Sequence, residues 1–137
     1  MNKKLATKAV EALTGPGFES RSGFCLRWTR QVVQSVYGSK YDAYWTASAT
    51  ETMAKVKGSP YAVKVDNTLP AGGSQVGDIL LKGTKTSGKY GHVGIRVIGN
   101  KVAENSSAHT SGTDREARGL RSLDAFGSFE LIMRLPE

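Results

Sequence analysis

The sequence predicts an α+β protein in which helices come first and a small antiparallel sheet follows. Apolar residues recur at helical spacing in the first part of the chain, and short runs rich in β-branched residues replace them from residue 61 onward. The two kinds of segment are grouped along the chain rather than alternating, which favours an antiparallel sheet over βαβ units. At 137 residues, the chain is expected to form one domain over residues 1–137.

A short amphipathic helix is expected at the N-terminus. Its apolar residues fall on one side: Leu5, Ala9, Val10 and Leu13. The Gly-Pro-Gly break at residues 15–17 ends it. The opening residues are basic but lack the apolar core and cleavage site of a signal peptide. We therefore expect a protein made in the host cytoplasm without an export signal of its own.

The second predicted helix contains Cys25, the only cysteine of the chain. Ser22 is a suitable N-cap, so Cys25 would lie in the first turn, and Gly38 would end the helix. Apolar residues at every fourth position mark a buried face: Phe24, Trp28, Val32 and Val36. The polar residues between them are expected to face water: Arg27, Arg30, Gln31 and Gln34.

A third helical pattern runs from about residue 42 to residue 55 and is followed by the strands. Strands are predicted at four places: residues 61–65, 76–83, 91–107 and 127–135. Gly99-Asn100 divides the third of these into a hairpin. The polar run over residues 106–119 is expected to form a long loop.

The composition is basic, with 19 Lys and Arg against 12 Asp and Glu, a net charge of +7. Most of the excess lies in residues 1–64, which carry 10 basic and 4 acidic residues. Such a surface attracts nucleic acid, anionic membranes or anionic envelope polymers, or it is simply a solvated surface. No apolar run approaches the roughly 20 residues needed to span a bilayer.

A thiol at the start of a helix is suited to nucleophilic chemistry. The free N–H groups and partial positive charge of a helix N-terminus favour the thiolate, and a neighbouring imidazole favours it further. The backbone N–H of Cys25 is also a candidate oxyanion donor. Ser22 or Tyr37 could supply a second donor. The alternative for Cys25 is a small buried apolar residue.

His92, one of two histidines, lies in a predicted strand. Three apolar residues alternate with it and are expected to face the core: Val93, Ile95 and Val97. His92 would therefore lie on the other face, with space around its ring at Gly91 and Gly94. If that face packs against the Cys25 end of the helix, the thiol and the imidazole can meet. The alternative is a structural histidine.

Glu104 lies on the strand that the hairpin pairs with the His92 strand. A carboxylate there would accept the imidazole N–H and orient the ring. The alternative is a surface ion pair with Arg96. Asn105 is a competing orienting residue, but adjacent strand residues point to opposite faces, so the two cannot serve equally.

These segments, GFCLRWTRQVV, VGDILL and GHVGIRVIGNKVAENSS, resemble the CHAP amidohydrolase/peptidase family and the related NlpC-like peptidases. Both are papain-like cysteine hydrolases of bacterial cell walls. The likeness covers roughly residues 20–107, which hold the core motifs. Residues 1–19 would be an N-terminal extension, and residues 108–137 match nothing that we can name.

The resemblance implies a papain-like fold and hydrolysis of a peptidoglycan amide bond, either between muramic acid and L-alanine or within the stem peptide. It makes Cys25 the nucleophile, His92 the base and Glu104 the third catalytic residue, with Asn105 as a possible fourth polar residue. Aromatic residues are expected to line the substrate cleft: Trp28, Tyr44 and Trp45.

No cofactor and no metal are expected. The thiol chemistry needs none, and the sequence has neither an HExxH motif nor a CxxC pair. His109, near Asp114 in the polar loop, could be imagined as a ligand, but we expect a solvated side chain there.

We expect a monomer that acts on the cell wall, binds peptidoglycan and adheres to an anionic envelope surface, without a nucleic-acid partner or a membrane span. A phage endolysin released through a membrane hole fits best. A tail-associated wall hydrolase and an injected antibacterial effector are alternatives. So is an intracellular cysteine protease or deamidase of the same fold. A non-catalytic basic binding module would instead use exposed rings for stacking: Trp28, Tyr41, Tyr44 and Trp45.

Overall fold

A computed structural model gives the fold of the chain and describes residues 1–110 and 116–137. Within these residues the helices are α1 (Lys3–Glu11), α2 (Cys25–Tyr37), α3 (Ala49–Lys57) and α4 (Leu123–Phe126). The strands are β1 (Ala62–Lys64), β2 (Ile79–Lys82), β3 (His92–Val97), β4 (Lys101–Asn105), β5 (Arg118–Ser122) and β6 (Leu131–Met133). Short 3₁₀ segments are η1 (Asp42–Tyr44), η2 (Pro70–Gly73) and η3 (Ser107–His109).

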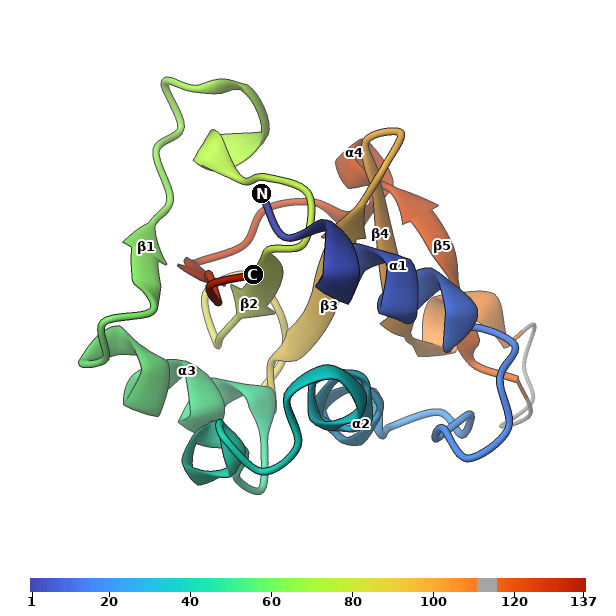
Figure 1. Ribbon diagram of the computed structural model, residues 1–137. Helices are drawn as coiled ribbons and strands as arrows, with labels where there is room; N and C mark the ends of the chain where they lie inside the picture. Colours follow the sequence, from blue (N-terminus) through green and yellow to red (C-terminus); the bar gives the residue numbers. More distant parts are fainter. Residues whose placement is uncertain (111–115) are drawn as a thin grey trace.

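The described strands form one sheet in the order β1-β6-β2-β3-β4-β5. Every neighbouring pair is antiparallel. Figure 1 shows α1 and α2 lying across the central strands, with α3 beside them. The predicted α+β class, with helices first and an antiparallel sheet second, is confirmed.

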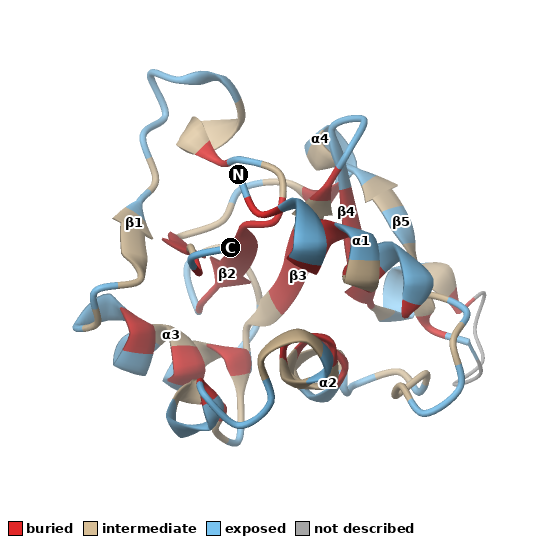
Figure 2. Ribbon diagram, viewed as in Figure 1, coloured by how far each residue is buried: buried red, intermediate tan, exposed pale blue. Residues whose placement is uncertain are grey.

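The two faces of the sheet are covered differently. Helices α1, α2 and α3 cover one face, where alternate strand residues pack against them: Ile79, Leu81, Val93, Ile95, Val97, Ala103 and Met133. The other face carries a smaller apolar cluster beside α4: Leu80, Val102, Phe126 and Ile132. Figure 2 shows the buried residues concentrated in β2, β3 and β4. Since burying one large apolar side chain contributes about 1.5–3 kcal/mol, the helix-covered face supplies most of the apolar stabilisation.

Helix α2 is anchored by Trp28, which is fully buried and donates its indole N–H to the carbonyl of Ala12 at 3.2 Å. Gly38 ends the helix with φ +63°, as predicted. The prediction for the first turn is wrong. Phe24, not Ser22, is the N-cap residue, no side chain caps the helix, and Phe24 is 38% exposed. The helix therefore begins at Cys25 itself, with its first N–H groups left without a side-chain cap.

Asn2 caps α1 and joins the two ends of the chain. Its side-chain oxygen accepts a hydrogen bond from the N–H of Leu5, and its side-chain nitrogen donates to the carbonyl of Leu135 at 3.1 Å. Gly77 approaches so closely that a Cβ there would lie 2.1 Å from the Asn2 carbonyl oxygen. Val10, which was expected on the buried side of this helix, is 46% exposed.

The helix predicted over residues 42–55 is two separate pieces. The 3₁₀ turn η1 comes first, and α3 begins at Ala49. The reason is local: Ser48 is an N-cap whose hydroxyl accepts a hydrogen bond from the N–H of Glu51 at 3.2 Å. The residues between η1 and α3 form one wall of the cleft described below.

Strands β3 and β4 form the predicted hairpin, with Val97 paired to Lys101. Gly99 and Asn100 have φ of +87° and +54°, the left-handed region that glycine and asparagine adopt most readily. The loop predicted over residues 106–119 ends earlier than expected, at the start of β5 (Arg118). There β5 begins and pairs with β4, and this added strand places Glu104 in the sheet interior, between β3 and β5.

Among the described residues, no helix is both long and apolar enough to cross a membrane. The longest of the described helices, α2, has 13 residues, against the roughly 20 that a bilayer requires.

Candidate active site

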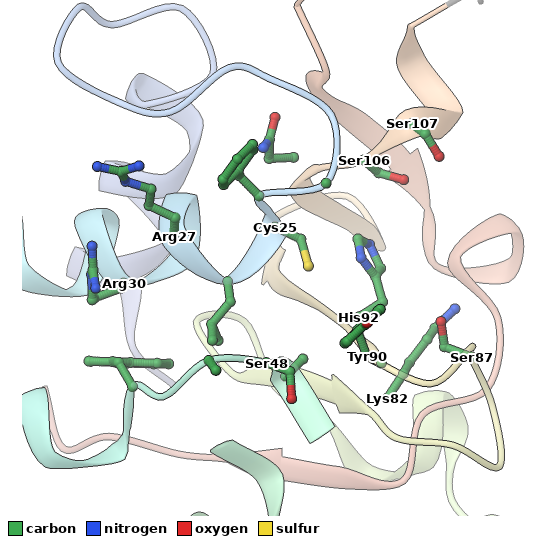
Figure 3. Close-up of a pocket in the computed structure, with 18 of the residues that line it drawn as sticks. Cys25, Arg27, Arg30, Ser48, Lys82, Ser87, Tyr90, His92, Ser106 and Ser107 are labelled. Carbon is green, nitrogen blue, oxygen red and sulfur yellow. The ribbon is translucent and has the colours of Figure 1, made fainter. Parts of the chain in front are cut away.

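Cys25 is the first residue of α2, and its side chain is partly exposed. Figure 3 shows its sulfur directed toward the ring of His92. The N–H groups in the first turn of an α-helix have no partner within the helix, and no side chain caps this one. The thiol therefore lies beside backbone donors and the positive end of the helix dipole, and it is accessible to a substrate.

His92 is the first residue of β3, so its ring lies at the end of the strand. The apolar residues that alternate with it, Val93, Ile95 and Val97, are buried under the helices, as predicted. The expected packing was wrong in one respect. Helix α2 covers the apolar face of the sheet, and only its first turn reaches the imidazole on the strand end.

Glu104 accepts a hydrogen bond from the imidazole of His92, with 2.6 Å between Nε2 and Oε1. With Nε2 engaged in this way, Nδ1 is the ring nitrogen available to the thiol. The register explains the contact. Ile95 pairs with Ala103, so Glu104 lies opposite Gly94 and diagonal to His92 on the same face of the sheet.

The Glu104 carboxylate is fully buried and holds two further partners that sequence reasoning did not identify. Arg121 donates from Nε to Oε2 at 2.5 Å and from Nη2 to Oε1 at 2.9 Å. His109 approaches Oε2 with its Nε2 at 2.9 Å. Arg121 is two residues beyond Gly119, the residue paired with Glu104, so it lies on the same face of β5. The expected alternative, a surface pair between Glu104 and Arg96, does not occur.

Two glycines leave space beside the Glu104 carboxylate, one for a partner and one for the core. Gly94 and Gly119 flank Glu104 on the neighbouring strands. A Cβ at residue 119 would lie 2.7 Å from Nδ1 of His109, and one at residue 94 would lie 2.5 Å from a methyl group of Val102. Gly119 therefore admits His109 to the carboxylate. Gly94 was expected to leave space around the His92 ring. In the structure it leaves space for the Val102 side chain instead.

The protonation states of His92 and Glu104 follow from the contacts that each side chain makes. Burial alone would lower the pKa of His92, but its interactions with Cys25 and Glu104 outweigh burial and raise the pKa to about 9. Burial alone would raise the pKa of Glu104, but hydrogen bonds from His92 and Arg121 lower it to about 2. At neutral pH the pair is therefore an imidazolium and a carboxylate.

Asn105 lies apart from this pair. It is buried, and its side-chain nitrogen donates to the carbonyl of Arg21 at 2.7 Å. Its side-chain oxygen has no hydrogen-bond partner among the described residues. Of the two orienting residues that were predicted, the structure brings only Glu104 to His92. Asn105 instead lines the cleft and fixes the segment that precedes Cys25.

Neither residue suggested as a second oxyanion donor lies in a suitable place. Tyr37 is at the far end of α2, where its hydroxyl donates to the carbonyl of Pro136 and accepts from Asn2. Ser22 does not line the cleft. The backbone N–H of Cys25 keeps its place as a candidate donor at the helix start.

A cleft of about 920 Å³ opens beside the sulfur and the imidazole. Cys25 and His92 both line it, and the segment from Trp45 to Ala49 forms the opposite wall. Two of the three aromatic residues expected in the cleft are not there. Trp28 is fully buried in the core, and Tyr44 packs edge-on against Tyr61.

His109 is not the solvated side chain that was expected. Only 17% of its side chain is exposed, and it contacts the Glu104 carboxylate. Asp114, considered with it as a metal ligand, lies outside the described residues. Among the residues that are described, no group of three or more His, Cys, Asp or Glu side chains is arranged to hold a metal ion.

No protein-family model matches the chain, and no curated protein matches it. Among solved structures, the crystal structure of Ly7917 is similar, with a TM-score of 0.52 and 20% sequence identity. The likeness covers 98% of this chain and 62% of that chain, so this chain corresponds to about three fifths of Ly7917. At that identity the likeness concerns the fold alone.

Proposed function

We propose that the chain is a papain-like cysteine hydrolase that cleaves an amide bond of bacterial peptidoglycan. One observation carries this proposal: Cys25, His92 and Glu104 follow one another in contact, and the first two open onto one cleft. A nucleophile, a base and a group that orients the base are the parts of a cysteine amidase or peptidase. The wall substrate rests on the resemblance to CHAP and NlpC-like enzymes.

In the proposed reaction the Cys25 sulfur attacks the amide carbonyl and forms a sulfur–carbon bond. The developing oxyanion accepts hydrogen bonds from first-turn N–H groups of α2, that of Cys25 included. When the carbon–nitrogen bond breaks, His92 gives its Nδ1 proton to the leaving amine. The neutral imidazole then takes a proton from water, whose oxygen attacks the thioester. The acid product leaves, and the thiolate and imidazolium are restored.

Glu104 acts through His92 in this scheme. Its carboxylate stabilises the imidazolium and keeps Nε2 engaged, so that Nδ1 faces the sulfur. Arg121 and His109 in turn hold the carboxylate from its other sides. The rest of the expected biology belongs to the same proposal: action on the cell wall, adhesion to an anionic envelope, and release as an endolysin or delivery from a phage tail or a secretion machine.

The basic binding module is less well supported. Three of the four rings that would provide stacking surfaces are buried: Trp28 is fully buried, Tyr41 is 1% exposed and Trp45 is 9% exposed. A base or sugar cannot stack on a ring enclosed in the core. The positive surface by itself fits either class.

Purified protein incubated with isolated peptidoglycan tests the proposal, alongside Cys25→Ala and His92→Ala. Wild type should release amines and clear the suspension, and both variants should be inactive while unfolding at nearly the wild-type temperature. Equal release by all three proteins would refute the site assignment. A DNA gel shift that survives Cys25→Ala, without wall hydrolysis by the wild type, would favour the binding module.

A further inference from the structure

The charged side chains that line the cleft all carry positive charge. They are Arg27, Arg30, Lys82 and Arg121, and the imidazolium of His92 adds to them. No Asp or Glu is among the described lining residues. A cleft walled by one sign of charge attracts a ligand of the other sign and holds it more strongly than open surface does.

Two of these cations already have carboxylate partners. Arg121 is bound to Glu104, and Arg27 lies 3.7 Å from a carboxylate oxygen of Glu19. The other two, Arg30 and Lys82, have no carboxylate partner among the described residues. They are the cations left to bind a ligand.

Lys82 is the more constrained of the two. It is 8% exposed, its ammonium donates to the carbonyl of Phe126, and it lies 4.2 Å from the centre of the Phe126 ring. Burial, followed by the nearby charge of Arg121, lowers the pKa of Lys82. The charge of Glu104 acts in the opposite direction, but Glu104 forms no ion pair with Lys82. A buried ammonium without a directly paired carboxylate is costly to keep, and an arriving anion would offset that cost.

Arg30 is the counterpart on the helix side. Its Nε is buried and has no hydrogen-bond partner among the described residues. It lies five residues beyond Cys25 on α2, a rise of about 7.5 Å along the helix. The buried Nε is closed to a ligand, but Arg30 lines the cleft, and the terminal nitrogens of a guanidinium are suited to binding a carboxylate.

The two cations lie on opposite sides of the reacting atoms. Lys82 is the cross-strand partner of His92, and Arg30 extends along α2 on the other side of the sulfur. Figure 3 shows Cys25 between them. A peptide with its scissile carbonyl at the sulfur would therefore pass one cation before that bond and the other after it.

We propose that the cleft binds a doubly anionic peptide, with Arg30 and Lys82 each holding a carboxylate, one on either side of the scissile amide. This inference rests on the proposed function and narrows it. In a muramoyl-L-alanine amide the only carboxyl group of the muramoyl part is the scissile one, so nothing on that side could pair with a cation. The cleft therefore favours a bond within the stem peptide.

Binding to the inactive Cys25→Ala protein tests the inference without turnover. The probe is N-acetylmuramoyl-L-Ala-γ-D-Glu-L-Lys-D-Ala in four forms, with the glutamyl α-carboxylate and the terminal carboxylate each free or amidated. Calorimetry should show that each amidation weakens binding about tenfold or more, the scale of a lost charged hydrogen bond. Equal affinity for all four forms would overturn the inference, whatever any variant does.

Variants assign the two subsites. Arg30→Gln and Lys82→Gln are each added to Cys25→Ala. In each double variant, amidation of one of the two carboxylates should no longer weaken binding. That carboxylate should be a different one in the two double variants. Lys40→Gln is the matched control, because Lys40 is exposed and does not line the cleft. An equal effect of Lys40→Gln would show that net charge, and not the two cations, governs binding.

Cleavage by the intact protein separates the two proposals. Carboxylate-dependent binding without any cleavage of peptidoglycan would refute the hydrolase and leave the two subsites standing. Cleavage that is indifferent to amidation, or cleavage at the muramoyl-L-alanine bond, would uphold the hydrolase and overturn the subsites.

Discussion

Replacing Glu104 by glutamine should uncouple the imidazole from its charge partner while keeping the shape of the side chain. The wild-type carboxylate is fully buried and is contacted by His92, His109 and Arg121. Glu104→Gln leaves these groups around a neutral amide. Removing one partner of a buried ion pair typically costs about 3–5 kcal/mol of folding stability.

The same change should lower the pKa of His92 from about 9 toward the ordinary imidazole value of 6.5. The interaction with Cys25 also raises this pKa and remains in the variant. We therefore expect Glu104→Gln to lower the pKa of His92 by about one unit or more, which corresponds to about 1.4 kcal/mol of interaction with the imidazolium. If the proposed mechanism holds, wall hydrolysis should fall by about a hundredfold or more, because the ring loses its orienting carboxylate.

Titration of the imidazole by nuclear magnetic resonance measures the pKa, and urea unfolding measures the stability. Glu11→Gln is the matched control, because that carboxylate is largely exposed and has Lys8 as its one ion-pair partner among the residues described. A Glu104→Gln protein whose His92 titrates as in wild type would refute the coupling that we infer. A loss of stability no larger than that of Glu11→Gln would show that the buried network contributes little.

Three more outcomes follow from the same network. Gly119→Ala should cost about 1–3 kcal/mol in urea unfolding, because its Cβ would clash with the His109 ring, and an unchanged midpoint would contradict the close approach. Arg121→Met should cost about 3 kcal/mol or more in the same measurement, because Glu104 would lose two charged hydrogen bonds, and a change below 1 kcal/mol would count against the pairing. The pKa of Glu104, about 2 when folded against 4.5 ordinarily, should make its stabilisation complete above pH 4.5 and lost as the pH falls through 2. The loss is about 3 kcal/mol, so acid unfolding of wild type should be steeper than that of Glu104→Gln, and parallel curves would exclude this carboxylate as the cause.

Local patterns were enough to predict the elements that carry the central residues. The four-residue spacing of apolar side chains located α2, and the alternation around His92 located β3. Cys25 does lie in the first turn of α2, but the N-cap from which this was predicted, Ser22, is two residues too early. The Gly99-Asn100 turn then fixed β4 beside β3, which brought Glu104 to the imidazole. Each of these inferences depends on neighbours within a few residues of one another.

The remaining parts of the site depend on contacts that are distant in sequence. Arg121 reaches Glu104 because β5 adds to the sheet edge, and the polar run over residues 106–119, with two glycines, gave no strand pattern. His109 approaches the same carboxylate only because Gly119 has no side chain. Trp28 was assigned to the cleft from the family resemblance, although its spacing marked it as part of the buried face of α2, and the structure follows the spacing. In the structure its indole N–H is satisfied by Ala12 in the core.

The Asn2 side chain, described above as the cap of α1, brings the two chain ends together. Figure 1 shows the N- and C-termini close to one another, and Lys4 adds a hydrogen bond from its N–H to Glu137. Tyr37 contacts this same region, so the termini lie at the far end of α2 from the sulfur, about 18 Å away along the helix axis. A fusion partner or affinity tag attached at either end would start a helix length from the cleft mouth. A linker that joins the N- and C-termini should likewise permit circular permutation without disturbing Cys25 and His92.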